Sequence, residues 1–159
     1  MVILRGAPAL TEFRHQSLLQ KIQSIVPEAG QVYAEFVHFL DLSSALDEAE
    51  EQRLQQLLDY GAQAERQQPA GRLFLVVPRI GTLSPWSSTA TDLLRHAGLD
   101  KLQRIERGTA YYLDAELNDS QAKALRALLH DRMSETVLAD LQAAAALFAE
   151  EQPRPLAAA

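Results

Sequence analysis

The sequence predicts an α+β domain made of two similar halves. Short runs rich in β-branched and aromatic residues alternate with stretches whose apolar residues recur every three or four positions. A helix-start signal, in which Asp or Asn precedes Glu or Gln by three residues, occurs at Asp47 and again at Asn118. The chain has 159 residues, of which 47% are hydrophobic, and this is enough for one well-packed core.

The first half, about residues 1–62, predicts two strands and two helices. Gly6 and Pro8 end the first strand, and Pro27 and Gly30 end the first helix. The expected elements are a strand over 2–5, a helix over 10–26, a strand over 31–42 (one strand, or two short strands with a bend near 37–38), and a helix from Asp47 to Gly61. Residues 63–71 are polar and predict a linker.

The second half, about residues 72–132, repeats this order. Ser87 or Ser88 is expected to cap its first helix, which ends at Gly98. Arg107-Gly108 interrupts the following strand pattern and predicts a hairpin there. The expected elements are a strand over 73–77, a helix ending at 98, a strand or hairpin over 102–117, a helix from 118, a further C-terminal helix over 133–150, and a linker or tail over 153–159.

The two halves correspond under one constant shift along the chain, which we call the internal shift. Helix caps, apolar stripes and strand residues move together under it, which chance explains poorly. The internal shift places Ile3-Leu4 on Phe74-Leu75, Glu35 on Glu106, Leu42 on Leu113, Leu46 on Leu117, Asp47 on Asn118, Glu50 on Gln121, and Leu54, Leu57 and Leu58 on Leu125, Leu128 and Leu129. Two half-sheets with helices on one face bury each other, so we expect a ferredoxin-like fold with pseudo-two-fold symmetry.

The segment between the strand over 73–77 and the next helix is the candidate functional site. It combines an arginine, a glycine, several hydroxyl residues and the only tryptophan. A helix start of this kind can receive an anion or a partner's carboxylate, and it can equally form only an N-cap and a turn. The candidate residues are Arg79, Gly81, Thr82, Ser84, Trp86, Ser87 and Ser88.

Composition excludes several kinds of chemistry. The chain has no cysteine, so it has no disulfide, thiolate metal site or cysteine nucleophile. Its four histidines, His15, His38, His96 and His130, lack metal-ligand spacing, and neither common nucleotide-binding loop is present. The net charge of −6 argues against a nucleic-acid surface. No apolar run approaches a membrane span, and we expect a cytoplasmic protein.

Arg5, Arg79 and Arg107 are the cations of interest, because the first two follow the first strands of the two halves and the third lies at the proposed hairpin. They are either ordinary surface arginines or contacts to an anion or a carboxylate at a docking face. Trp86 is either an interface anchor or a side chain that packs over its own loop.

Five separated motifs resemble one family. They are residues 3–10, 33–39, 78–79 with Gly81-Thr82-Leu83-Ser84-Pro85-Trp86-Ser87-Ser88, 104–112, and 130–133 with 135–137. In order, they closely resemble the N-terminal domain of the large single-chain phosphoribosylformylglycinamidine synthase, the FGAR amidotransferase of purine biosynthesis. The resemblance covers residues 1–152. In that family the domain looks like a fused pair of the small PurS-type subunit.

The resemblance implies a part of a ligase that uses ATP, Mg²⁺ and glutamine. It implies no catalysis by this chain and no cofactor within it; the domain would bridge the synthetase and glutaminase parts, its partners, and help to form the ammonia path. The loop of residues 81–92 would lie toward the synthetase site and supply docking or substrate-side contacts. Ile80 and Thr89 stand where the family usually has Pro and Lys. The alternatives are a free-standing ferredoxin-like module that binds a small anion and, third, an independent enzyme.

Overall fold

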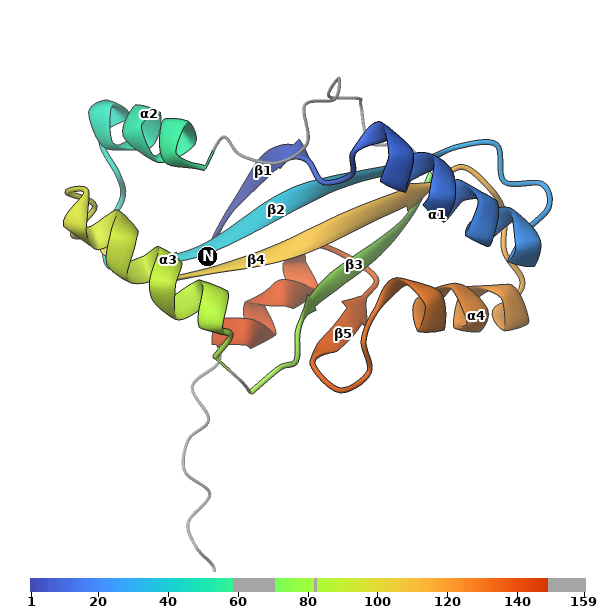
Figure 1. The fold of residues 1–159 in the computed structure, drawn as a ribbon. Helices are drawn as coiled ribbons and strands as arrows, with labels where there is room; N and C mark the ends of the chain where they lie inside the picture. Colours follow the sequence, from blue (N-terminus) through green and yellow to red (C-terminus); the bar gives the residue numbers. More distant parts are fainter. Residues whose placement is uncertain (59–70, 82, 149–159) are drawn as a thin grey trace, which may run out of the picture.

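The computed structural model describes residues 1–58, 71–81 and 83–148. Its framework is a five-stranded antiparallel sheet with the strand order β1-β2-β4-β3-β5 (Figure 1). The expected helix end at Gly61, the linker over 63–70 and the tail over 153–159 lie outside the described residues. The elements are β1 (Val2–Pro8), α1 (Glu12–Ile25), β2 (Val32–Leu42), α2 (Glu48–Leu57), β3 (Arg72–Pro78), α3 (Pro85–His96), β4 (Leu102–Leu113), α4 (Asp119–Leu129), β5 (Glu135–Leu138) and η1 (Gln142–Phe148).

The expected α+β fold with two corresponding halves is confirmed. Each half runs strand, helix, strand, helix, and the strands β2 and β4 pair at the centre of the sheet. Val37 lies opposite Gly108 in this pair, and the internal shift also places Val37 on Gly108. The pseudo-two-fold axis therefore passes through the Val37–Gly108 pair.

The expected hairpin at Arg107-Gly108 is wrong. Of the two interpretations of residues 31–42, the single strand is confirmed and the bend near Val37-His38 is not found. β2 and β4 are continuous, and they pair in one register from Val32–Leu113 to Asp41–Arg104. Gly108 serves close packing instead, because a Cβ atom there would lie 2.9 Å from Val77 Cγ1 and 3.1 Å from the Val76 carbonyl oxygen.

The sheet separates two layers. On one face, α1 and α4 cover one end of the sheet and α2 and α3 cover the other end (Figure 1). The opposite face packs against η1 through Ala144 and Leu147. The core of that face includes Val37, Phe39, Leu75, Val77 and Ala110.

The expected C-terminal helix over 133–150 is wrong. β5 adds to the free side of β3, where Val137 pairs with Val76, and the following 3₁₀ helix η1 is short. The Asp140 carboxylate accepts a hydrogen bond of 2.7 Å from the Ala143 N–H at the start of η1. The helix-like spacing of Val137 and Leu141 therefore does not come from one helix. Val137 lies in β5 and Leu141 in the connection before η1, and the two side chains pack against different core clusters.

The helix-start signals of both halves are confirmed. Asp47 and Asn118 each form a capping box: their side chains accept from the third residue of the helix, and the Glu50 or Gln121 side chain accepts from the cap N–H. No helix in the described ranges is long and apolar enough to cross a membrane.

Candidate functional site

The candidate segment is a tight connection between β3 and α3. Gly81 has φ 90°, a conformation that glycine adopts without a steric cost. Ser84 caps α3 and Pro85 follows at the start of the helix, so the expectation that Ser87 or Ser88 is the cap is wrong. The Ser84-Pro85 pair is itself a helix-start signal, because proline is favoured at the first helical position. Thr82 lies outside the described residues.

The hydroxyl side chains of this segment bind the edge of β4. The Ser87 hydroxyl donates to the Ile105 carbonyl over 2.6 Å, and the Thr91 hydroxyl accepts from the Ile105 N–H over 3.2 Å. The Ser84 hydroxyl donates to Glu106 Oε1 over 2.9 Å. β3 pairs with β4 only from Val76–Thr109 onward, so α3 side chains take the place of a neighbouring strand beside Ile105. Ser88 is exposed.

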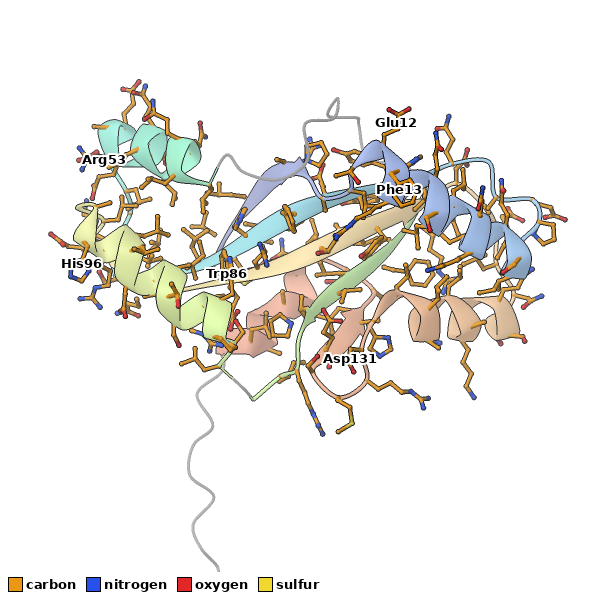
Figure 2. The ribbon with its side chains drawn as sticks, in the orientation of Figure 1. Glu12, Phe13, Arg53, Trp86, His96 and Asp131 are labelled. Atoms are coloured by element: carbon orange, nitrogen blue, oxygen red, sulfur yellow. The ribbon has the colours of Figure 1, made fainter. Side chains whose placement is uncertain are left out.

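Arg107 lies between two aromatic rings. Its guanidinium carbon is 4.7 Å from the centroid of Phe36 and 4.8 Å from that of Trp86. Trp86 sits where α3 faces the sheet (Figure 2), and its ring centroid is 6.0 Å from that of His38. Burial, assisted by the positive charge of Arg107, lowers the pKa of His38 from 6.5 to about 4. His38 is therefore neutral at pH 7.

A hollow of about 470 Å³ opens beside this stack, and we call it the Arg107 hollow. Of the candidate residues, Arg79, Ser84 and Trp86 line it; Gly81, Ser87 and Ser88 do not. The segment before β5 forms the other wall, held by a 2.9 Å hydrogen bond from the Arg79 N–H to the Ser134 carbonyl. The described residues that line it are Val76, Pro78, Arg79, Leu83, Ser84, Pro85, Trp86, Arg107, Thr109, Met133, Ser134 and Glu135.

The wall formed by Met133, Ser134 and Glu135 is not predicted by the sequence. Met133 begins the expected C-terminal helix over 133–150, whereas in the structure it precedes β5 and is 82% exposed. The pairing of β5 with β3, from Leu75–Leu138 to Pro78–Glu135, brings this segment beside β3. No local signal marks such a pairing, because it depends on contacts between residues far apart in the chain.

Arg5 has a structural role rather than a place in this hollow. It lies within β1, and its guanidinium donates two hydrogen bonds, of 2.7 and 2.8 Å, to the Glu35 carboxylate. The Tyr33 hydroxyl donates to the same carboxylate over 2.9 Å. The hydrogen bonds to Glu35 raise the pKa of Arg5 above its ordinary value.

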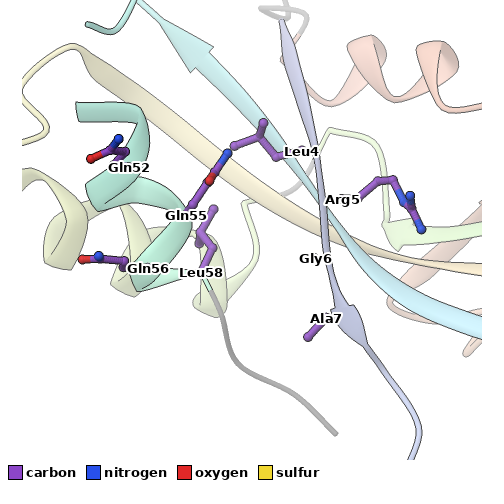
Figure 3. Close-up of a pocket in the computed structure, with 8 residues that line it drawn as sticks. All are labelled: Leu4, Arg5, Gly6, Ala7, Gln52, Gln55, Gln56 and Leu58. Carbon is purple, nitrogen blue, oxygen red and sulfur yellow. The ribbon is translucent and has the colours of Figure 1, made fainter. Parts of the chain in front are cut away.

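A second hollow, of about 550 Å³, lies between β1 and α2. Gln52, Gln55 and Gln56 of α2 provide most of its polar side chains, and Arg5 extends from β1 on the side away from these glutamines (Figure 3). In the parts of the chain that are described, no three His, Asp or Glu side chains form a group able to hold a metal ion.

The family of the chain is identified by comparison with models of known protein families. The model of the family described as the formylglycinamide ribonucleotide amidotransferase N-terminal domain matches residues 35–148, well over half of the chain. The chain belongs to this family. The expected family is thereby confirmed over the matched residues, and it associates the chain with an enzyme of purine biosynthesis. The matched region of this amidotransferase domain begins within β2 and ends with η1. It therefore includes every described residue that lines the Arg107 hollow.

Proposed function

We propose that residues 1–152 act as a non-catalytic docking domain of FGAR amidotransferase. In this proposal the domain contacts the synthetase and glutaminase parts of the enzyme and helps to form the path for ammonia between them. The observation that best supports docking is the exposed apolar surface at the Arg107 hollow. Leu83 is 59% exposed, Met133 is 82% exposed, and Ile80, close to Leu83 in the chain, is 43% exposed.

Exposed apolar side chains scattered singly need no explanation, but a group of them around a concave surface is typical of an interface. Leu83 and Met133 come from segments that are distant in the sequence, and they line the same hollow. The Arg79–Ser134 backbone hydrogen bond joins these segments. A docked partner would remove both apolar side chains from water, which favours association.

The polar groups of the site support a non-catalytic role. The hydroxyls of Ser84 and Ser87 donate to Glu106 and to the Ile105 carbonyl, so each is engaged with β4. His38 is fully buried, and its lowered pKa makes it a weak base at pH 7. A nucleophile needs an adjacent base in hydrogen-bond reach. The base that the Ser84 hydroxyl contacts is the Glu106 carboxylate, which also accepts a hydrogen bond from Arg104.

Complementation tests this proposal. The chain is added to a preparation of the synthetase and glutaminase parts that lacks this domain, and formation of the amidine product is measured with glutamine or with ammonium chloride as nitrogen source. We expect binding and a larger gain with glutamine than with ammonium, because the ammonia path serves only glutamine-derived ammonia. Absence of binding contradicts docking, and an equal gain with both nitrogen sources contradicts the role in the ammonia path.

The isolated chain provides the control for the anion-binding alternative. Its thermal unfolding is followed with added nucleotides, sugar phosphates and amino acids. A docking domain is expected to show no saturable shift of Tm with these small molecules, whereas a free-standing anion-binding module would show one.

A further inference from the structure

We infer that the Arg107 hollow receives an acidic side chain, flanked by apolar residues, from the protein segment on which this domain docks. The inference rests on the proposed docking function and adds the chemistry of the partner. It is carried by three features of the hollow: the held guanidinium of Arg107, the balance of charge in the lining, and the apolar rim.

Arg107 is suited to act as the anchor for a carboxylate. The rings of Phe36 and Trp86 are stacked near its guanidinium at 4.7 and 4.8 Å, which restricts the motion of a side chain that otherwise has many rotamers. Stacking uses the faces of the guanidinium, whereas its N–H donors lie in its plane. An arginine held in this way loses less entropy when a carboxylate binds, and arginine pairs with carboxylates through two parallel hydrogen bonds.

The lining carries a positive charge although the chain as a whole carries −6. Among the described residues of the lining, Arg79 and Arg107 contribute two guanidinium groups and Glu135 contributes one carboxylate. Glu135 Oε1 already accepts a hydrogen bond of 2.9 Å from the Asp131 N–H. The local charge therefore favours an approaching anion over a cation.

The apolar rim of the hollow favours a protein segment over a small free anion as the ligand. An ion the size of phosphate or acetate would contact the arginines but would leave Leu83 and Met133 in water. These side chains are 59% and 82% exposed. Apolar residues on both sides of an acidic residue would cover them. The combination of an arginine anchor with apolar contacts is also the usual composition of the energetically important centre of an interface.

The sole tryptophan allows a direct test. Trp86 lines the hollow and packs against Arg107, and the chain contains no other tryptophan. The chain labelled with 5-fluorotryptophan gives one fluorine resonance, and the unlabelled synthetase–glutaminase preparation adds none. We expect this resonance to shift when the preparation binds. Binding without a shift would overturn the inference while leaving the docking function intact.

Matched variants test the chemistry of the contact. We expect Leu83→Asp and Arg79→Glu each to raise the Kd for the same preparation by about tenfold or more, since about 1.4 kcal/mol corresponds to a factor of ten. Leu93→Asp and Arg95→Glu are the controls, because both positions are exposed on α3 and neither lines the hollow. The controls are expected to change Kd by less than about twofold, as surface substitutions outside a contact usually do.

The outcomes separate the two proposals. Loss of affinity in the hollow variants alone supports the inference. Equal effects of the hollow and control variants would place the contact elsewhere and overturn it, with docking retained. A complete absence of binding by the unmodified chain would overturn docking and the inference together. The last outcome is a shift of the fluorine resonance with acetate or phosphate alone, at concentrations that leave partner binding unchanged. That result would show a small-anion site and would also overturn the inference.

Discussion

Glu35 and Glu106 occupy equivalent positions in the two halves, each two residues before the central Val37–Gly108 pair. Both side chains are fully buried. Glu35 accepts from Arg5 and Tyr33, whereas Glu106 accepts from Arg104 and Ser84. A buried carboxylate is costly without such partners. The duplicated fold thus keeps one buried acid in each half but pairs each with different residues.

Glu35→Gln is expected to destabilise the domain strongly. The change removes the charge that Arg5 and Tyr33 solvate, and breaking a buried ion pair typically costs about 3 kcal/mol, less here because 36% of the Arg5 side chain is exposed. Urea unfolding measures the effect. Glu50→Gln is the control, since its partner Lys101 lies at the surface, and it should cost clearly less. Equal losses in the two variants would contradict the importance of burial.

Gly108→Ala is expected to lower the unfolding free energy by about 1–3 kcal/mol, the usual cost of overpacking a core. The new Cβ would approach Val77 Cγ1 to 2.9 Å and Leu75 Cδ1 to 3.2 Å. Gly30→Ala is the control: no heavy atom lies within 4 Å of its Cβ position and its φ is not positive. That change should be neutral or stabilise by roughly 0.4–1 kcal/mol. A tolerated Gly108→Ala would contradict the close packing of β3 and β4.

Ser87→Ala is expected to cost about 1–3 kcal/mol, because the Ile105 carbonyl loses its buried hydroxyl donor. The neighbouring variant Ser88→Ala removes an exposed hydroxyl and should change the unfolding free energy by less than about 0.5 kcal/mol. Both are measured by urea unfolding at pH 7. If the two variants behaved alike, Ser87 would have no special role at the edge of β4.

The domain is expected to lose stability in mild acid because the unfolded chain protonates His38 more readily than the folded chain does. The pKa of His38, about 4 in the folded state, lies below the ordinary 6.5, so the unfolded chain binds this proton more tightly. The contribution of neutral His38 to the stability of the fold is complete above about pH 6.5 and is lost progressively as the pH falls toward 4. Between pH 7 and pH 5 the loss should be about 2 kcal/mol.

Unfolding of His38→Gln at the two pH values checks this expectation. The variant should lose correspondingly less stability between pH 7 and pH 5 than the unmodified chain, whatever its absolute stability. His96→Gln, at an exposed position near the end of α3, should keep the original pH dependence. An unchanged pH dependence in His38→Gln would show that His38 does not remain neutral in the fold.

Much of the fold could be predicted because its signals are local. The capping boxes at Asp47 and Asn118 require only residues three positions apart, and the apolar stripes of the helices follow from the helical repeat. The correspondence of these signals under the internal shift then predicts two halves that pack together. The general place of the candidate site, between β3 and α3, also follows from the order of these elements.

Tertiary contacts decided the remaining features. Gly108 resembles a turn residue in sequence, but it lies within β4 because Val76 and Val77 of β3 pack directly against it. Residues 133–148 form β5 and η1 rather than a helix because β3 offers an unpaired side and the sheet offers an apolar face. Arg107 obtains its position from Phe36 and Trp86, which are distant in sequence. Local patterns set helix starts and periodicity, whereas pairing partners and the composition of a hollow depend on residues that meet only when the chain folds.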